Sequence, residues 1–382
     1  MKRVRAYHTV ALLGAVTALT LTACGQGTGG AGGAETSATP IPTQGEQTPT
    51  QQAGEVTGTV WVANEDGNSL TAIDAETSEV ATTVTGIEAP HNVQVGPDGT
   101  VWAVSGHSNA LVALDPATYQ LTGTAATGQS PAHVILTPDG ARVYVTNAGE
   151  DTLGVYDAAT LDRVATVEVG DGPHGLRPSG NGEVVVVANT GAGTIDVVQI
   201  ATNEVSASIP VGDSPAQVAV DNDGDYAYVS LAGDSSVAKV DLAEQTVVGS
   251  VEVSAPPVQL YLTPDGTRLL SADQGTEQTA GDTVSVIDTE AMTVTDSITT
   301  GSGPHGVVVD TTGETAWVTN LYDDTISVLD LTTNEAVATV PVGDMPNGIS
   351  YSPTPPAPGP QSLTLTVPDY AEDEPTSEHD HG

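Results

Sequence analysis

Residues 131–147 read PAHVILTPDGARVYVTN, two short runs of apolar and β-branched residues on either side of a tight turn. The first run follows Pro131, and the second contains Tyr144. The pair Asp139-Gly140 between the runs predicts a β-hairpin, because glycine accepts the positive φ that such turns need. Similar turns occur at residues 97–99 and 264–266. The stretch therefore indicates an all-β protein built from repeated hairpins.

The repeat has a period of about 42 residues. A proline recurs at intervals of 41, 42, 42, 42, 47 and 42 residues, and the long interval contains extra residues at 274–281. The seven prolines are Pro90, Pro131, Pro173, Pro215, Pro257, Pro304 and Pro346. Each unit reads as four short strands, which is typical of a β-propeller blade, so we expect an all-β, seven-bladed β-propeller.

The third strand of most units ends near an aspartate. We expect these side chains to accept hydrogen bonds from backbone N–H groups of the following turn and to have no further function. They are Asp74, Asp115, Asp157, Asp241, Asp288 and Asp330.

The repeat begins and ends out of phase. Residues 59–62 read as a second strand with no first strand before them, and residues 347–351 read as a first strand with no second strand after them. The C-terminal strand is therefore predicted to pair with the three N-terminal strands, which closes the ring and removes exposed sheet edges.

The N-terminal segment has the features of a secretory signal. Basic residues near the start precede an apolar run from about Val10 to Leu21, which is too short to span a bilayer. Residues 21–24 read LTAC and resemble the lipobox of bacterial lipoproteins, and Cys24 is the single cysteine. The resemblance implies cleavage before Cys24 and lipidation of its sulfur. It also implies a location outside the cytoplasm, with the protein held on the outer face of the cell membrane by its lipid.

These features divide the chain into four parts. We expect a signal peptide at 1–23, a lipidated Cys24 with a disordered Gly/Ser/Thr/Pro tether at 24–56, the propeller at 57–353, and a Pro-rich, then acidic tail at 354–382. Residues 362–367 alternate like a strand and could pack on the side of the propeller.

The chain is strongly acidic. It has 8 Lys and Arg against 49 Asp and Glu, a net charge of −41. Such a surface repels nucleic acids and anionic lipids and attracts cations, so we expect no nucleic-acid partner. We expect a monomer, with the membrane as one partner through the lipid and a metal ion or an envelope protein as a further one.

The second strands carry a recognisable motif. Residues 144–147 read YVTN, and 317–320 (WVTN), 61–64 (WVAN) and 186–189 (VVAN) are variants of it. Over residues 58 to 352 the chain resembles the YVTN-repeat family of seven-bladed propellers. That resemblance implies the fold and leaves the activity open, because this architecture carries many functions.

All five histidines of the repeat region are predicted to lie on one face of the ring. His91, His174 and His305 directly follow repeat prolines, His133 lies one place further along its strand, and His107 lies in a loop after a second strand. The loops on that face follow polar residues at the ends of second strands, and a further amide follows the last repeat proline. These candidate ligand-face residues are Asn64, Asn147, Asn189, Asp273, Asn320 and Asn347. Acidic residues share the face: Glu65, Asp66, Glu150, Asp151, Asp171, Asp323 and Asp324.

Two interpretations of the histidines stay open. Neutral imidazoles in an acidic environment suit Zn²⁺ or Cu²⁺. His91, His174 and His305, which directly follow repeat prolines, are spaced two, three and two blades apart around the channel. His379 and His381 in the tail add candidate ligands. The alternative is that these histidines occur together only because the repeat was duplicated. Each would then form a structural hydrogen bond, and the channel would be too wide for three side chains to meet.

Three functions compete at this level. The first is a tethered binding protein that presents the histidine- and acid-rich face to a ligand, such as a divalent metal. Some propellers similar to this one serve as zinc metallochaperones. The second is a channel enzyme of the lactonase or streptogramin-lyase type, which residues 95–102 resemble. The first strands carry acids only at their far ends (Asp221, Asp310), which argues against that enzyme. The third is a structural or protein-interaction propeller. We assign no catalytic residue and no cofactor beyond Zn²⁺ or Cu²⁺.

Overall fold

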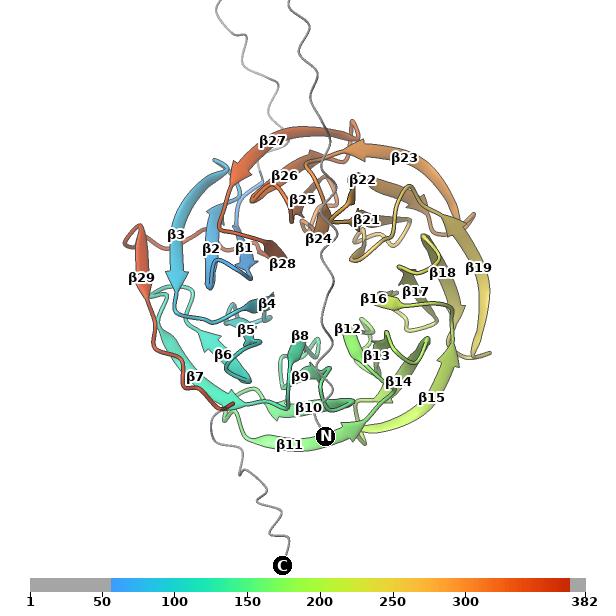
Figure 1. Cartoon of the computed structure of the whole chain (residues 1–382), viewed down its shortest axis with the longest axis horizontal. Helices are drawn as coiled ribbons and strands as arrows, with labels where there is room; N and C mark the ends of the chain where they lie inside the picture. The colour runs from blue at the N-terminus through green and yellow to red at the C-terminus, as the bar shows by residue number, and fades with distance from the viewer. Residues whose placement is uncertain (1–55, 372–382) are drawn as a thin grey trace, which may run out of the picture. The chain divides into compact units, whose positions relative to one another are not determined.

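The computed structural model describes residues 56–371, which form seven β-sheets arranged in a ring around a central axis (Figure 1). Strands and turns account for the regular structure of this range, as the sequence predicts, and it contains no helix long and apolar enough to cross a membrane. The signal peptide, Cys24, the tether up to residue 55, His379 and His381 lie outside the described residues.

Each of the first three blades has four strands, with the strand that begins at the repeat proline lying innermost. The first blade contains β4 (Pro90–Val95), β5 (Val101–Ser105), β6 (Ala110–Leu114) and β7 (Leu121–Ala126). The second contains β8 (Pro131–Leu136), β9 (Arg142–Asn147), β10 (Thr152–Asp157) and β11 (Arg163–Glu168). The third contains β12 (Pro173–Pro178), β13 (Val184–Asn189), β14 (Thr194–Gln199) and β15 (Glu204–Pro210).

The next three blades repeat the pattern. The fourth contains β16 (Pro215–Val220), β17 (Tyr226–Leu231), β18 (Ser236–Asp241) and β19 (Thr246–Glu252). The fifth contains β20 (Leu260–Leu262), β21 (Arg268–Thr276), β22 (Thr279–Asp288) and β23 (Thr293–Thr299). The sixth contains β24 (Pro304–Val309), β25 (Thr315–Asn320), β26 (Thr325–Asp330) and β27 (Glu335–Pro341). The extra residues at 274–281 lengthen the β21–β22 hairpin, where Thr276 pairs with Thr279.

The seventh blade joins the two ends of the ring. Its strands are β28 (Pro346–Ser352), β1 (Thr59–Asn64), β2 (Ser69–Asp74) and β3 (Glu79–Thr85). β28 runs antiparallel to β1, with Ser352 opposite Thr59 and Ile349 opposite Val62. The predicted closure is therefore confirmed, and it satisfies the backbone groups that an open first or last strand would expose.

Apolar side chains fill the spaces between neighbouring blades. Val62 and Ile73 of the seventh blade pack with Val308 and Trp317 of the sixth. The second and third blades are joined in the same way through Tyr144 and its neighbours. Because each sheet is covered on both faces, strands such as β1 and β5 are buried along their whole length.

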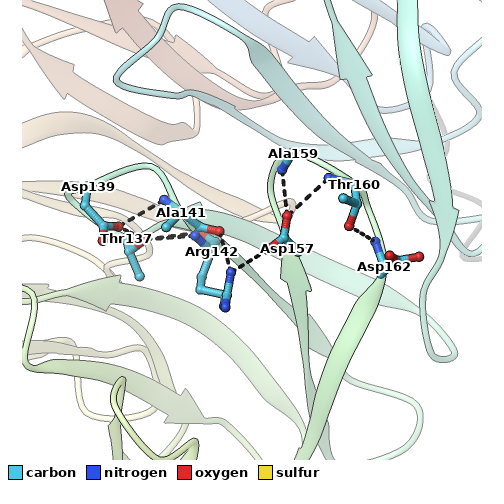
Figure 2. Close-up of polar contacts among 8 residues, drawn as sticks. All are labelled: Thr137, Asp139, Ala141, Arg142, Asp157, Ala159, Thr160 and Asp162. Carbon is cyan, nitrogen blue, oxygen red and sulfur yellow. Dashed lines mark hydrogen bonds and ion pairs between the residues drawn. The ribbon is translucent and has the colours of Figure 1, made fainter.

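Polar side chains fix the turns, as Figure 2 shows for the second blade. One carboxylate oxygen of Asp157 accepts hydrogen bonds from the N–H groups of Ala159 (3.1 Å) and Thr160 (3.2 Å). The other forms an ion pair with Arg142 at 2.7 Å. All six aspartates predicted to stabilise turns accept such backbone hydrogen bonds.

The C-terminal segment crosses the outside of the ring closure. β29 (Ser362–Thr364) adds a fifth strand to the seventh blade, parallel to β3, which confirms the predicted strand in part. Leu365 is buried next to β29, and the hydroxyl of Tyr119 donates to the carbonyl of Ala357 at 2.6 Å. The segment therefore connects the seventh blade to the first.

A truncation measures the contribution of this segment. Ending the chain after Pro355 removes β29, exposes the apolar surface under Leu365 and leaves the Tyr119 hydroxyl without its acceptor. We expect a loss of about 3 kcal/mol in the free energy of unfolding, and a melting temperature lower by roughly 5 °C. Thermal unfolding followed by circular dichroism tests this, and an unchanged melting temperature would show that the segment is not a stabilising element.

Candidate metal centre

The innermost strands place histidines at one end of the channel. His91 on β4, His174 on β12 and His305 on β24 directly follow the first proline of their strands, and His133 is the third residue of β8. The pairing of each of these strands with the next shifts register just after the proline. Strict alternation of side chains is interrupted there, so the first and second positions after the proline can both approach the channel.

The threonine of the YVTN motif ties two of these strands together. The hydroxyl of Thr146 accepts a hydrogen bond from the backbone N–H of His133 at 3.0 Å and donates to the backbone carbonyl of His174 at 2.7 Å. Neighbouring innermost strands are thus fixed at the level of their histidines. The same motif residue that marks the repeat in the sequence positions the candidate ligands.

Three histidines from consecutive blades converge. One ring nitrogen of each of His91, His133 and His174 lies within 4.8 Å of the others. The Nε2 atoms of His91 and His174 are 3.1 Å apart. Two nitrogens bound tetrahedrally to one zinc ion, with Zn–N bonds of about 2.1 Å, lie about 3.4 Å apart. The spacing of these nitrogens therefore fits a single metal ion.

Hydrogen bonds at Nδ1 direct the Nε2 atoms inward. The Nδ1 atom of His174 lies 2.9 Å from the carbonyl oxygen of Ala216, and that of His305 lies 2.8 Å from the side-chain oxygen of Gln274. An oxygen of this kind only accepts, so Nδ1 carries the proton and Nε2 keeps its lone pair. Metal-binding histidines are commonly oriented by an outer acceptor of this type.

Glu65 plays the same part for His91. Its carboxylate lies 3.1 Å from Nδ1 of His91 and accepts a hydrogen bond from the Asn347 amide at 2.7 Å. The Asn347 nitrogen is also 3.1 Å from that Nδ1 atom, so the three groups form a triangle on the wall of the channel. A carboxylate, an imidazole and an inward Nε2 atom form the arrangement that strengthens a histidine as a metal ligand.

The local electrostatics keep His133, His174 and His305 uncharged at neutral pH. Burial, reinforced by neighbouring histidines, lowers the pKa of His174 to about 4 and that of His305 to about 3. The same causes hold the pKa of His133 well below its usual value. Burial alone would raise the pKa of Glu65, but its hydrogen bond and charge interaction with His91 and its hydrogen bond from Asn347 lower it to about 2. Neutral imidazoles beside a carboxylate are the protonation states that metal binding requires.

The cluster is incompletely satisfied without a cation. Both ring nitrogens of His133 are buried and have no hydrogen-bond partner within residues 56–371. The Nε2 atoms of His91 and His174 lie 3.1 Å apart, within hydrogen-bonding distance of each other, and a cation between them would engage both nitrogens. Buried polar atoms without partners are costly, and a bound cation would satisfy several of them together.

The five predicted histidines separate into three groups. His91, His133 and His174 meet, although they come from three consecutive blades and not from an evenly spaced ring. His305 lies beside them, with its ring centroid 6.4 Å from that of His91. His107 is exposed in the turn between β5 and β6 and is not part of the cluster.

Five of the six polar residues predicted to face a ligand are buried and do not contact the histidine cluster. Asn64, Asn147, Asn189, Asp273 and Asn320 are buried at the ends of the second strands. Their side chains hydrogen-bond serine or threonine hydroxyls of the adjacent third strand, or backbone groups of nearby loops, as when Asn147 accepts from Gly128 N–H and donates to Thr152. Similar bonds hold the others. They therefore stabilise contacts within and between blades and are not presented to a ligand; Asn347 alone of the six contacts the cluster.

Three contributors were not identified individually from the sequence. Glu65 is one of seven acidic residues predicted for this face, and no sequence signal separates it from the other six. Gln274 belongs to the extra residues of the fifth blade, and the carbonyl of Ala216 is a backbone group. No sequence motif predicts the contact of Gln274 with His305 or that of the Ala216 carbonyl with His174.

The buried imidazoles predict a pH dependence of stability. Above pH 6.5 both the folded and the unfolded chain hold these histidines neutral. As the pH falls from 6.5 to about 4, the unfolded chain binds protons at positions that the folded chain keeps unprotonated. Stability is therefore complete above pH 6.5 and is lost on acidification, by about 3 kcal/mol for His174 alone. Lowered carboxylate pKa values, as at Glu65, act in the same direction at lower pH.

Melting temperatures of the metal-free chain between pH 8 and pH 4 measure this effect. The control is a variant with His133→Ala, His174→Ala and His305→Ala, in which the decline between pH 6.5 and pH 4 is expected to be shallower. Equal slopes for the two chains would contradict the assignment of buried, neutral histidines.

Comparison with known proteins identifies the family. The sequence model of the YNCE-like β-propeller family matches residues 100–352, which is more than half of the chain. The chain is a YNCE-like β-propeller. This agrees with the resemblance to YVTN-type seven-bladed propellers. No curated protein matches the chain by sequence.

Solved structures similar to this YNCE-like propeller come from proteins of different kinds. Hydrazine synthase of Kuenenia stuttgartiensis is 24% identical, with 69% of this chain and 90% of that chain covered and a TM-score of 0.61. A protein of Desulfotomaculum acetoxidans is 15% identical, with coverages of 78% and 100% and a TM-score of 0.68. AztD of Citrobacter koseri is 13% identical, with coverages of 78% and 98% and a TM-score of 0.59. At these identities the similarity establishes the fold alone.

Proposed function

We propose that this YNCE-like propeller is an extracytoplasmic metal-binding protein that carries one Zn²⁺ or Cu²⁺ ion at the end of its channel. The observation that supports this most directly is the convergence of His91, His133 and His174, whose ring nitrogens lie within 4.8 Å of one another. Imidazole nitrogen is a preferred ligand of both ions.

Three protein ligands favour a transferable ion over a permanent structural one. Structural zinc sites have four protein ligands, whereas a site with three leaves a position open. In this protein the open position can be taken by water, by His305 or by a ligand from a partner that receives the ion. The net charge of −41 raises the local concentration of cations around the channel.

The proposed location follows from the N-terminal sequence. Cleavage before Cys24 and lipidation of its sulfur would tether the propeller to the outer face of the cell membrane. We propose that it acts there as a monomer and exchanges its metal with an envelope protein. Its acidic charge disfavours nucleic acids as partners.

The channel-enzyme alternative lacks a comparable constellation. Among the described residues, Glu65 is the carboxylate that contacts the histidine cluster, and its hydrogen bonds to His91 and Asn347 orient them. A lactonase or lyase centre needs a further group that acts as general acid or base on a substrate. Metal handling requires only the ligands that the cluster supplies.

Calorimetric titration of the metal-free chain with Zn²⁺ and Cu²⁺ tests the proposal. A Cys24→Ser chain is used, so that the single thiol cannot bind metal. We expect one saturable site per chain, with a dissociation constant in the micromolar range or tighter, and release of the ion on acidification. Absence of saturable binding of either ion would overturn the proposal.

A further inference from the structure

The other end of the channel contains a cavity of about 780 Å³. Its lining comes from the C-terminal ends of all seven innermost strands and from the segments that follow them, so it lies at the end opposite the repeat prolines. Its volume is in the range of small-molecule binding sites. The histidine cluster does not line this cavity.

One cation lies on the wall of the cavity. Arg177, the fifth residue of β12, is the single Lys or Arg among the lining residues. Five basic residues occur in the described range, and four of them donate hydrogen bonds to a carboxylate or to backbone carbonyls: Arg142, Arg163, Lys239 and Arg268. Within the same range no hydrogen bond or ion pair engages the Arg177 guanidinium.

Tyr261 lies next to Arg177. The guanidinium carbon is 5.8 Å from the centroid of the Tyr261 ring, and both residues line the cavity. No hydrogen bond engages the Tyr261 hydroxyl within residues 56–371 either. The Arg177 guanidinium and the Tyr261 hydroxyl therefore both offer hydrogen-bond donors to the same cavity.

A partly buried guanidinium without a carboxylate partner is unfavourable for stability. Side chains of arginine remain protonated in proteins, so Arg177 keeps its charge. The surrounding chain has few cations and many acids, so this arginine is not part of a basic surface. Residues that lower stability in a cavity are often retained for binding.

We propose that Arg177 and Tyr261 bind the carboxylate of a small organic acid inside this cavity, which we call the Arg177 pocket. The planar guanidinium can donate two parallel hydrogen bonds to a carboxylate, and the Tyr261 hydroxyl can donate a third. Ile135 and Ala219 occupy the equivalent position on neighbouring strands and provide apolar wall for the carbon skeleton of the ligand.

The rim of the Arg177 pocket limits the charge of the ligand. Asp98, Asp221 and Asp310 line it, and their carboxylates accept hydrogen bonds from their own turns. Fixed negative charges at the rim repel a multiply charged anion more than a monocarboxylate. The proposal is independent of the proposed metal site, because the residues that carry it are different.

Calorimetric and NMR titrations of the metal-free Cys24→Ser chain test the proposal. Benzoate, acetate and inorganic phosphate are added at constant ionic strength. We expect saturable one-to-one binding of benzoate or acetate, with phosphate weaker than both. Arg177→Met should reduce the affinity at least about tenfold and Tyr261→Phe should reduce it less, because a charge-assisted hydrogen bond is stronger than a neutral one. Arg163→Met on the outer strand β11 is the matched control and should bind normally.

The ligand-free chains provide a second measurement. Because methionine removes an unpaired charge and keeps the packing volume, Arg177→Met should melt at the same or a higher temperature than the parent chain. No saturation by either carboxylate, tighter binding of phosphate, or unchanged affinity in Arg177→Met would overturn the proposal. Repeating the benzoate titration with His91→Ala/His133→Ala/His174→Ala separates the two sites, since this variant should still bind the acid.

Discussion

Replacing His91, His133 and His174 together by alanine is expected to abolish saturable binding of Zn²⁺ and Cu²⁺. These residues supply the three ring nitrogens within 4.8 Å of one another, and the carboxylate of Glu65 cannot replace them because it faces Nδ1 of His91. The folded chain should tolerate the change, because replacing His133 removes two buried ring nitrogens that have no hydrogen-bond partner within residues 56–371. Calorimetry gives the affinity, and the melting temperature shows that the ring is intact.

Two further variants make the result specific. His107→Ala changes an exposed histidine outside the cluster and should leave the affinity unchanged. Glu65→Gln keeps an acceptor for His91 but removes the negative charge, so the affinity should fall by roughly 10- to 100-fold, as for other outer partners of metal ligands. Metal binding that persists in the triple variant would place the ion elsewhere.

Removing the closing strand is expected to have the largest effect on stability. A chain that ends after Met345 lacks β28 and leaves β1 as an open innermost edge. Ile349 then no longer covers the apolar contact between the sixth and seventh blades, which includes Val62 and Trp317. We expect a loss of about 5 kcal/mol or more, seen as a chain that is recovered unfolded or aggregated.

The chain that ends after Pro355 is the matched control, because it keeps β28 and loses only the outer segment. A point variant within the full chain gives an independent test. A side chain at Gly348 would place its Cβ 2.7 Å from the Cα of Asn92 on β4, so Gly348→Val should lower the melting temperature strongly. If the chain without β28 melted cooperatively near the temperature of the control, closure by β28 would not be what holds the ring together.

The proposed metal site depends on the width of the channel at its proline end. Histidines that follow prolines on β4 and β12 come within 3.1 Å at Nε2, even though β8 lies between their blades. His133 from β8 fills the space between them, with its ring centroid 4.7 Å from that of His174. Three histidines can therefore meet in this channel when they come from consecutive blades.

The fold can be predicted from the amino-acid sequence alone. The regular prolines, the Asp-Gly turns and the four short strands per unit predict seven blades, because local turn chemistry and alternating burial repeat with the same period. The out-of-phase ends predict closure of the ring. Asp157 and the equivalent aspartates of the other blades predict turn hydrogen bonds, which Figure 2 shows for Asp157. These features depend on residues close together in the chain, so a linear sequence records them.

Which polar residues meet depends on the three-dimensional arrangement of the blades. His133 lies one position away from the other histidines in the repeat, and the irregular start of β8 brings it to them. Glu65 precedes its partner Asn347 by 282 positions, and Arg177 lies next to Tyr261 from two blades away. The curvature of the ring and the shifted register of its innermost strands set these contacts, and neither is encoded in the spacing of residues along the chain.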